Sequence, residues 1–293
     1  MQYTIDFDKL DNSQIAQVGG KNASLGEMYQ RLRAKGIKVP DGFATTADAF
    51  RDFINREGLL SRIEETLKRL DRKTFSNLTK IGKEVRELIS HATLPDEFIL
   101  AIKKSYSELK AREKDLESVA VRSSATAEDL PEASFAGQHQ SFLNISGEQE
   151  VVEAVHKCIV SLYRDRAIKY REDFGFDHSQ IAISAGIQRM VRSDLASAGV
   201  AFTLEPETGF EKIIFINGSW GLGDNVVGGV VNADQYYLYK KNLNAGHQAI
   251  LAKELGLKEK TLVYAEADRQ ANDKTINKDT PEDKRKQFVL TDT

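Results

Sequence analysis

The sequence predicts an α+β protein with two lobes, in which a helical front half is followed by mixed, mostly antiparallel β-strands. Over the first 117 residues, apolar side chains recur at the three- and four-residue spacing of one helical face. From Ser118 onward this pattern gives way to short β-like runs separated by Gly, Asn and Asp. We expect one lobe over residues 1–145 and a second over residues 146–293.

The front half divides into five amphipathic segments, each expected to be a helix. Their starts or apolar stripes lie after Lys21, near Thr45 or Thr46, at Ser61, over Ile81–Ile89 and after Pro95. Ser61 with Glu64 matches a capping box, in which each side chain satisfies a backbone N–H at the helix start. We therefore expect a helix to begin at Ser61.

The second half combines strands with one long helix. The expected strands are SVAVRSS, QSFLNI, IAISAGIQRMV, AGVAFTL, KIIFING, YYLYKK and TLVYAE. The helix is expected over roughly Glu148 to Asp173, where apolar residues keep core-facing spacing. Its basic residues alternate with apolar anchors, so we interpret them as a solvated face. They are Arg164, Arg166, Lys169 and Arg171.

Composition and charge exclude several classes of protein. The 293 residues include 41 Lys+Arg and 44 Asp+Glu, which gives a net charge of −3 and disfavours a nucleic-acid scaffold. No apolar run approaches the roughly 18 residues that span a bilayer, so no membrane partner is expected. The start of the chain has no secretory signal pattern, and the single cysteine, Cys158, excludes an internal disulfide. The expected compartment is the cytoplasm.

Gly19-Gly20-Lys21 stands directly before an expected helix. Glycines let the backbone approach a ligand closely, and a helix N-terminus offers N–H donors and a positive dipole end. A lysine there adds a point charge that suits phosphate. The motif is not a Walker A loop, because Ile15 replaces the first Gly and Asn22 replaces the Ser or Thr. By itself the motif is more typical of a turn with a surface lysine than of a phosphate site.

A stronger pattern runs from Val121 to Gly137, VRSSATAEDLPEASFAG. An expected strand delivers Arg122 at its end, and small and hydroxylated residues follow. Arginine grips phosphate oxygens with paired donors, and a small-residue loop can add backbone N–H groups. The alternative, a Ser-rich surface loop, does not need an arginine at the strand end. This segment therefore predicts a polyphosphate site.

Other motifs carry no chemistry of their own. Gly221 and Gly223 in WGLGDNVVGGVVNAD imitate a dinucleotide fingerprint, but Val226 stands where Gly or Ala should pack and no clear helix follows. We reject a Rossmann fold there. The five histidines lack metal-ligand spacing, and no nucleophile elbow is present, so neither a metal site nor a Ser-His-Asp triad is predicted in this chain.

Taken together, the motifs resemble the N-terminal ATP-grasp nucleotide-binding domain of the phosphoenolpyruvate synthase family. The matching blocks are VGGKNASLGEM, VPDGFATT, VRSSATAEDLPEASFAGQHQSFLNI, IQRMVRSD and WGLGDNVVGGVVNAD. Pyruvate phosphate dikinases and rifampin phosphotransferases belong to the same wider group. The segment from Ile187 to Phe210, with its MVRSD and EPETG, is more similar to the synthases.

The resemblance implies that ATP lies in the cleft between two lobes. Lys21 and Arg122 are then the phosphate-holding cations, Gly137 covers the phosphates through backbone donors, Ser141 contributes a hydroxyl, and Gln188 faces the adenine. The family uses ATP and Mg²⁺ to phosphorylate a histidine on a swivelling domain. The phosphoryl group then travels to pyruvate in a barrel-shaped domain, giving phosphoenolpyruvate, AMP and phosphate.

Several family features are missing from this sequence. The family's metal-holding D-I-E-W and Q-A-R-P-E-T strands and its accepting histidine do not occur, and Thr291-Asp-Thr293 resembles a helix cap. Asn232-Ala-Asp-Gln235 stands where Asn-Pro-Asp-Glu is usual. We therefore expect a second lobe truncated at its C-terminal end and a fragment without activity of its own. The alternatives are the same domain of a rifampin-type dikinase, or a free-standing nucleotide-sensing module.

Overall fold

The computed structural model describes residues 1–126, 129–130, 133–134, 141–265 and 274–292. The chain divides into two compact units, Met1–Met190 and Val191–Thr293, called unit 1 and unit 2 below. Each unit is described by itself. The expected lobe division after residue 145 falls inside unit 1.

Unit 1 is built on an antiparallel sheet with the described strand order β1-β2-β7-β3-β6. The strands are β1 (Thr4–Asp6), β2 (Gly42–Thr45), β3 (Val119–Ala125), β6 (Ser141–Ile145) and β7 (Ile183–Arg189). A short separate hairpin joins β4 (Asp129–Leu130) to β5 (Ala133–Ser134). β3 and β7 pair along the whole length of both strands and form the centre of the sheet.

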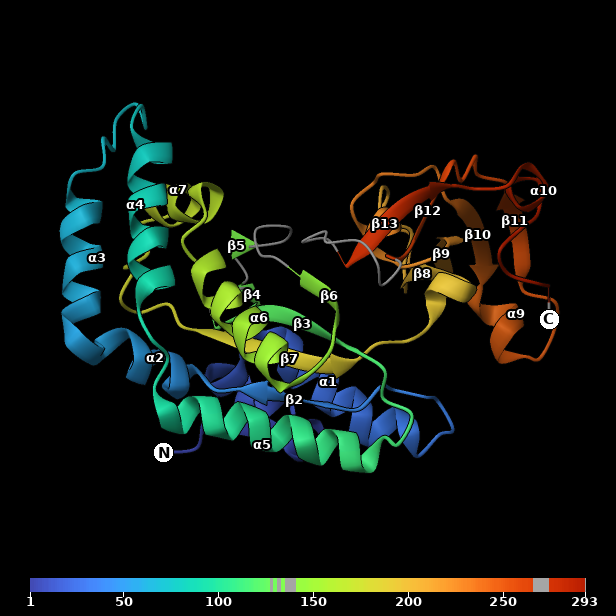
Figure 1. Ribbon diagram of the computed structural model, residues 1–293. Helices are drawn as coiled ribbons and strands as arrows, with labels where there is room; N and C mark the ends of the chain where they lie inside the picture. Colours follow the sequence, from blue (N-terminus) through green and yellow to red (C-terminus); the bar gives the residue numbers. More distant parts are fainter. Residues whose placement is uncertain (127–128, 131–132, 135–140, 266–273, 293) are drawn as a thin grey trace. The chain divides into compact units, whose positions relative to one another are not determined.

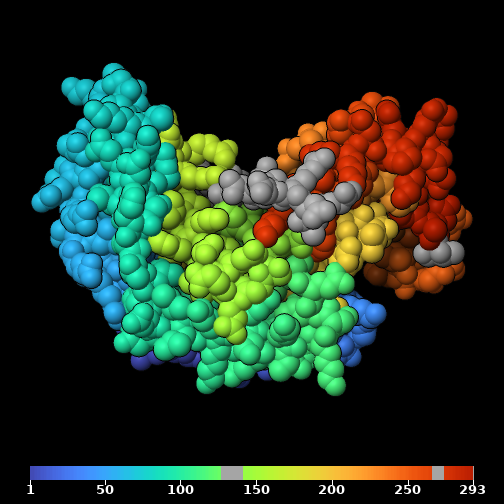
Figure 2. Space-filling view, in the orientation of Figure 1, coloured from blue at the N-terminus to red at the C-terminus, as the bar shows by residue number. Residues whose placement is uncertain are grey.

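Helices cover both faces of this sheet (Figure 1). They are α1 (Ile15–Arg33), α2 (Ala47–Asn55), α3 (Leu59–Lys68), α4 (Leu78–His91), α5 (Asp96–Arg112), α6 (Glu148–Ser161) and α7 (Asp165–Asp173), with 3₁₀ turns at Phe7–Lys9, Asn12–Gln14 and Arg56–Gly58. The side chains of α3 and α4, which contact each other, form one continuous projection in the space-filling view (Figure 2). Within the described ranges, no helix is both long and apolar enough to cross a membrane.

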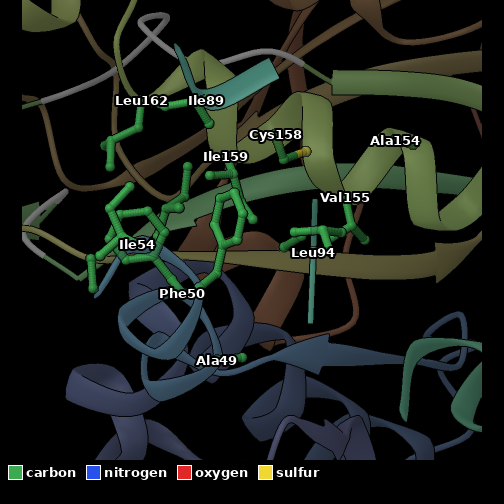
Figure 3. Packing of buried hydrophobic residues seen from close by; sticks show 14 of the residues in the cluster. Ala49, Phe50, Ile54, Ile89, Leu94, Ala154, Val155, Cys158, Ile159 and Leu162 are labelled. Atoms are coloured by element: carbon green, nitrogen blue, oxygen red, sulfur yellow. The ribbon is translucent and has the colours of Figure 1, made fainter. Parts of the chain in front are cut away.

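The two faces of the sheet have different neighbours because strand side chains alternate. Phe43, Val121 and Ile187 point into the large apolar core under α2, α4, α5 and α6. Part of this core is drawn in Figure 3, where Phe50 lies near Ile159. On the opposite face α1 contacts β3 and β7, and Ala44 joins a smaller apolar cluster with residues of α1 and the N-terminal segment. That face carries polar side chains of β3 and β7 beside α1.

The structure confirms most of the expected elements. All seven expected strands are present. The strands that were not anticipated are β1, β2, β4, β5, β11 and β13. α2 begins where expected, because the Oγ1 of Thr46 accepts a hydrogen bond from the N–H of Ala49 at 3.1 Å. The capping box at Ser61 is wrong. α3 already begins at Leu59, after Gly58 in the left-handed region (φ 68°), so Ser61 lies inside the helix.

The single helix expected over 148–173 is also wrong, because α6 and α7 are separated at residues 162–164. In a continuous helix the carbonyls of Leu162 and Tyr163 accept from N–H groups four residues later. Here Arg171 Nη1 donates to the Leu162 carbonyl at 2.7 Å, and Arg86 Nη1 donates to the Tyr163 carbonyl at 2.9 Å. Two side chains therefore occupy acceptors that a continuous helix needs.

The expectation that Arg171 belongs to a solvated basic face is also wrong, because its side chain is buried. Its Nε donates to His178 Nδ1 at 2.8 Å, so Nε2 of His178 carries the proton and donates to Glu172 at 3.0 Å. Arg72 closes the cluster with two hydrogen bonds to Glu172. Burial lowers the pKa of Arg171 to about 10, and burial together with the Arg171 charge lowers the pKa of His178 to about 4.

Unit 2 contains an antiparallel sheet of described order β11-β10-β9-β8 and a separate ribbon of β12 and β13. Its elements are β8 (Ser197–Phe202), β9 (Ile213–Trp220), α8 (Asp224–Val227), β10 (Asp234–Tyr239), α9 (Lys240–Asn244), β11 (Ile250–Glu254), β12 (Lys260–Tyr264), β13 (Thr275–Asp279), α10 (Glu282–Arg285) and the 3₁₀ turn Ser193–Leu195. The glycine-rich segment joins β9 to β10, which pair antiparallel. A Rossmann unit needs parallel strands there, so its rejection is confirmed.

The buried carboxylate of Asp234 connects three segments of unit 2. Asp234 Oδ1 accepts from the N–H of Gly256 at 2.8 Å and from Lys258 Nζ, and both charged side chains are fully buried. Its Oδ2 accepts from the N–H of Val289 at 2.8 Å. Asp234 keeps the Asp of the family's Asn-Pro-Asp-Glu pattern, from which its neighbours Ala233 and Gln235 depart, and its role here is structural.

The cluster around His178 predicts a loss of stability in mild acid. A folded pKa of about 4, below the usual 6.5, means that the unfolded chain takes up the proton first as the pH falls. The stabilisation is complete above pH 6.5 and is lost progressively towards pH 4. Between pH 7.5 and 5 this histidine should contribute a decrease of about 2 kcal/mol in the free energy of unfolding. Urea unfolding at both values measures it, with His178→Gln as the comparison. Equal pH dependence in the two proteins contradicts the assignment.

Candidate functional site

A cavity of about 330 Å³ lies in unit 1, on the face of the sheet that α1 covers. Its wall is formed by the part of α1 that follows the bend at Gly19, by the middle of β3 and by the second half of β7. The lining residues are Gly20, Lys21, Asn22, Ser24, Leu25 and Met28 of α1, Arg122 and Ser123 of β3, and Gly186 and Gln188 of β7. This volume lies at the lower end of the range of small-molecule sites.

Three of the five predicted site residues meet at this cavity. Lys21, Arg122 and Gln188 line it although they are far apart in the sequence. Ser141 is not part of the described lining, but it is the cross-strand partner of Arg122 in the β3–β6 ladder. Gly137 lies outside the described residues.

The strand register places Arg122 and Gln188 on the same face. Arg122 pairs with Gly186 across β3 and β7, and Ala120 pairs with Gln188. Residues two apart in a strand share a face, so Arg122, Gly186 and Gln188 all point towards α1. Because Gly186 has no side chain, α1 can pack close to β7 at this position.

The backbone of α1 turns out of the helical region at Gly19, which has φ 76° and ψ 161°. A new run of helix therefore begins after Gly19, at the edge of the cavity. The first N–H groups of such a run have no acceptor within it, and its dipole is positive at this end. Lys21 sits in this first turn, so backbone donors and a side-chain cation converge on one place.

The start of α1 is held against the sheet by what we call the helix seat, which consists of Gly19, Asn22, Ser124, Ser184 and Gly186. A Cβ on Gly19 would lie 2.3 Å from Ser124 Oγ, and a Cβ on Gly186 would lie 2.1 Å from Asn22 Oδ1. Both contacts require glycine. Asn22 Nδ2 donates to Ser184 Oγ at 2.8 Å and to the Val18 carbonyl at 3.1 Å.

The hydrogen bonds of the seat continue into β2. Ser184 Oγ donates to the Thr45 carbonyl at 2.6 Å, and Thr45 Oγ1 accepts from the N–H of Ala185 at 2.8 Å. Sequence reasoning missed Asn22, Ser184 and Thr45, because nothing in their local sequence indicates that these distant segments meet. The position of Asn22 directly after Lys21 was the one clue available.

Gln188 is nearly buried, with 9% of its surface exposed, and its Nε2 lies 3.4 Å from the Pro40 carbonyl. The neighbouring Asp41 is fixed firmly. Its Oδ2 accepts from Arg112 Nε at 3.0 Å, and its Oδ1 accepts from the N–H of Gly42 at 2.7 Å. The VPDGFATT block therefore supports the cavity wall from the neighbouring strand β2, where Gly42 pairs with Gln188.

Charge distinguishes this cavity from the other described ones. The cavity in unit 1 combines Lys21 and Arg122 with a helix N-terminus and no acidic side chain in its described lining. A cavity of about 830 Å³ in unit 2 is lined by Glu205, Glu207 and Glu211 beside one lysine, Lys212, so its lining repels anions. Another cavity of about 340 Å³ in unit 1 combines Arg56 and Arg62 with the acidic Glu57 and Asp96. The first cavity is therefore the better anion site. Among the described residues, no cluster of three or more His, Cys, Asp or Glu is placed to hold a metal ion.

Comparison with known proteins agrees with this chemistry. The family model of the pyruvate phosphate dikinase AMP/ATP-binding domain matches residues 15–293. A phosphoenolpyruvate synthase of Neisseria meningitidis is 47% identical over 291 residues, which are 99% of this chain and 36% of the relative. The synthase of Pseudomonas aeruginosa is 46% identical over 293 residues (100% and 37%), and that of Escherichia coli 45% over 285 residues (97% and 36%). The chain thus spans little more than a third of the length of these relatives.

The close packing of Gly19 in the helix seat predicts that a larger residue there destabilises the protein. Gly19→Ala should lower the free energy of unfolding by at least about 2 kcal/mol, because its backbone region is almost exclusive to glycine and its new Cβ meets Ser124. Gly36→Ala is the matched control, since Gly36 also has a positive φ (81°) but nothing lies within 4 Å of a Cβ there. Its cost should stay near 1 kcal/mol. Urea unfolding compares the two, and equal losses would show that close packing at Gly19 is unimportant.

Proposed function

The chain belongs to the family of the pyruvate phosphate dikinase AMP/ATP-binding domain, and on this basis we propose that it binds ATP in the cavity of unit 1. The observation that carries the proposal is the convergence of Lys21, Arg122 and the helix start after Gly19 on one cavity. Two cations and a set of backbone donors suit a polyphosphate.

In this proposal each cavity residue has a distinct role. Lys21 acts as a point charge on the phosphates, and Arg122 grips phosphate oxygens with paired donors. Gln188, at the cavity wall, contacts the adenine. Ser141 adds a hydroxyl beside Arg122, and Gly137 covers the phosphates with backbone donors. These groups hold and orient ATP and neutralise phosphate charge, which is the main protein contribution to phosphoryl transfer.

We further propose that the chain is a two-lobed ATP-grasp domain, with lobes at 1–145 and 146–293. The α+β composition and the family support the ATP-grasp assignment. They do not bear on the bounds of the lobes, and the two compact units divide after Met190 rather than after residue 145. Mg²⁺ bound with the nucleotide would neutralise further phosphate charge. We propose that its ligands lie in parts of the protein other than the described residues of this chain.

The proposed whole-protein reaction converts pyruvate, ATP and water to phosphoenolpyruvate, AMP and phosphate. It proceeds through a phosphohistidine on a swivelling domain, and pyruvate binds in a barrel. We propose that both lie in the part of the relatives' length that this chain does not span, which is nearly two thirds of it. The names of the relatives favour this reaction over a rifampin-type dikinase, whose acceptor is a drug.

The ATP site predicts that either cation is needed for tight binding. Lys21→Ala and Arg122→Ala should each weaken the affinity for a non-hydrolysable ATP analogue by about 10- to 100-fold, since a charge-assisted contact contributes roughly 1.5–3 kcal/mol. Isothermal titration measures this. Lys80→Ala, on an exposed part of α4, is the control and should bind like the wild type. Unchanged affinity in both cavity variants would remove the assigned site.

The proposed reaction predicts a specific product pattern. A protein that carries this chain with the remaining length of its relatives should form phosphoenolpyruvate, AMP and phosphate in equal amounts from pyruvate and ATP. Phosphorus NMR quantifies all three. ADP as the main nucleotide product would contradict a dikinase reaction. Phosphorylation of rifampin in place of pyruvate would favour the alternative acceptor.

A further inference from the structure

We propose that Asn22 is the positioning residue of the ATP site, in that it sets the place of Lys21 by fixing the start of α1 on β7. The inference rests on the proposed ATP-binding function and goes beyond it, because Asn22 acts on the position of Lys21. Asn22 borders the cavity, but its amide nitrogen donates to Ser184 Oγ and to the Val18 carbonyl. Its side chain is buried, with 2% exposed.

The carboxamide of Asn22 lies along β7 and is fixed at both ends. Its nitrogen donates to Ser184 Oγ, and its oxygen occupies the place of a Cβ on Gly186. Ser184 and Gly186 are two residues apart and share the face towards α1. A rotation or shift of the helix start would break the hydrogen bond or leave the space above Gly186 empty.

The seat connects Asn22 to the second cation through the strand ladder. Gly186 is the cross-strand partner of Arg122, so the carboxamide rests on the residue beside Arg122. Lys21 directly precedes Asn22 and lines the same cavity as Arg122. The spacing of the two cations is therefore set by one buried side chain.

The hydrogen-bond chain makes this position stiff. Asn22 bonds to Ser184, and Ser184 bonds to the Thr45 carbonyl of β2, so the helix start is tied across two adjacent strands. Asn22 Nδ2 also donates to the carbonyl of Val18, which lies in α1 on the other side of the bend at Gly19. The bend and the seat are thus held by the same side chain.

Asn22→Ala is expected to weaken the affinity for a non-hydrolysable ATP analogue by about three- to tenfold, and to leave adenosine affinity unchanged. The effect should disappear in a Lys21→Ala background, because Asn22 acts through Lys21. Isothermal titration of the four proteins measures both. Asn77→Ala is the control, since Asn77 also bridges backbone groups in unit 1 but lies away from the cavity. It should lose stability and keep ATP affinity.

A second cycle uses the contact with Gly186. Gly186→Ala should weaken ATP affinity because its Cβ collides with Asn22, and adding Asn22→Ala should remove most of that collision. The double variant is therefore expected to bind no more weakly than Gly186→Ala alone. If Asn22→Ala does not fold, Ser184→Ala removes the same hydrogen bond with a smaller change, and it should weaken ATP affinity in the same direction.

The outcomes separate this inference from the proposed function. Wild-type ATP affinity in Asn22→Ala or Ser184→Ala, with weak binding in Lys21→Ala, overturns the positioning role alone. An equal loss from Asn22→Ala with and without Lys21 also overturns it. Unchanged binding in Lys21→Ala and Arg122→Ala overturns the ATP site itself.

Discussion

The close approach of α1 to the central strands is the constraint on which the site depends. Two glycines, one on each side of the contact, leave room for it: Gly19 faces Ser124, and Gly186 faces Asn22. Any side chain at these positions would move the helix away from the sheet. The distance between helix and sheet in turn decides whether Lys21 and Arg122 can act on one ligand. Packing and ligand chemistry are therefore set by the same contact.

The central strands β3 and β7 contribute to the apolar core on one face of the sheet and to the cavity on the other. Val121 and Ile187 stabilise unit 1 by burying apolar surface, while Arg122 and Gln188, on the neighbouring positions, face the cavity. A rigid apolar core behind a strand limits movement of the polar residues in front of it. The positions of Arg122 and Gln188 are therefore held by the apolar core on the other face of the same strands.

Local sequence patterns were enough to predict much of the fold and part of the candidate site. The helix start near Thr46 and the presence of a strand at Arg122 were predictable, because neighbouring residues determine both. The expected strand end at Arg122 is wrong, since β3 continues to Ala125 and Arg122 lies in its middle. The break between α6 and α7 was not, since it depends on Arg86, which is distant in sequence. The burial of Arg171 was not predicted either, because it depends on how the folded chain packs around that side chain. The bond between Asn22 and Ser184 joins residues 162 apart, and no spacing rule reaches that far.

Asp234 in unit 2 has a consequence for how that unit opens. One carboxylate binds the N–H of Gly256, the ammonium of Lys258 and the N–H of Val289, so three chain segments share a single anchor. Release of one partner leaves a buried charge less well compensated, which weakens the hold on the others. The segments around β10, Gly256 and Val289 should therefore exchange their amide hydrogens as one cooperative unit rather than fraying separately.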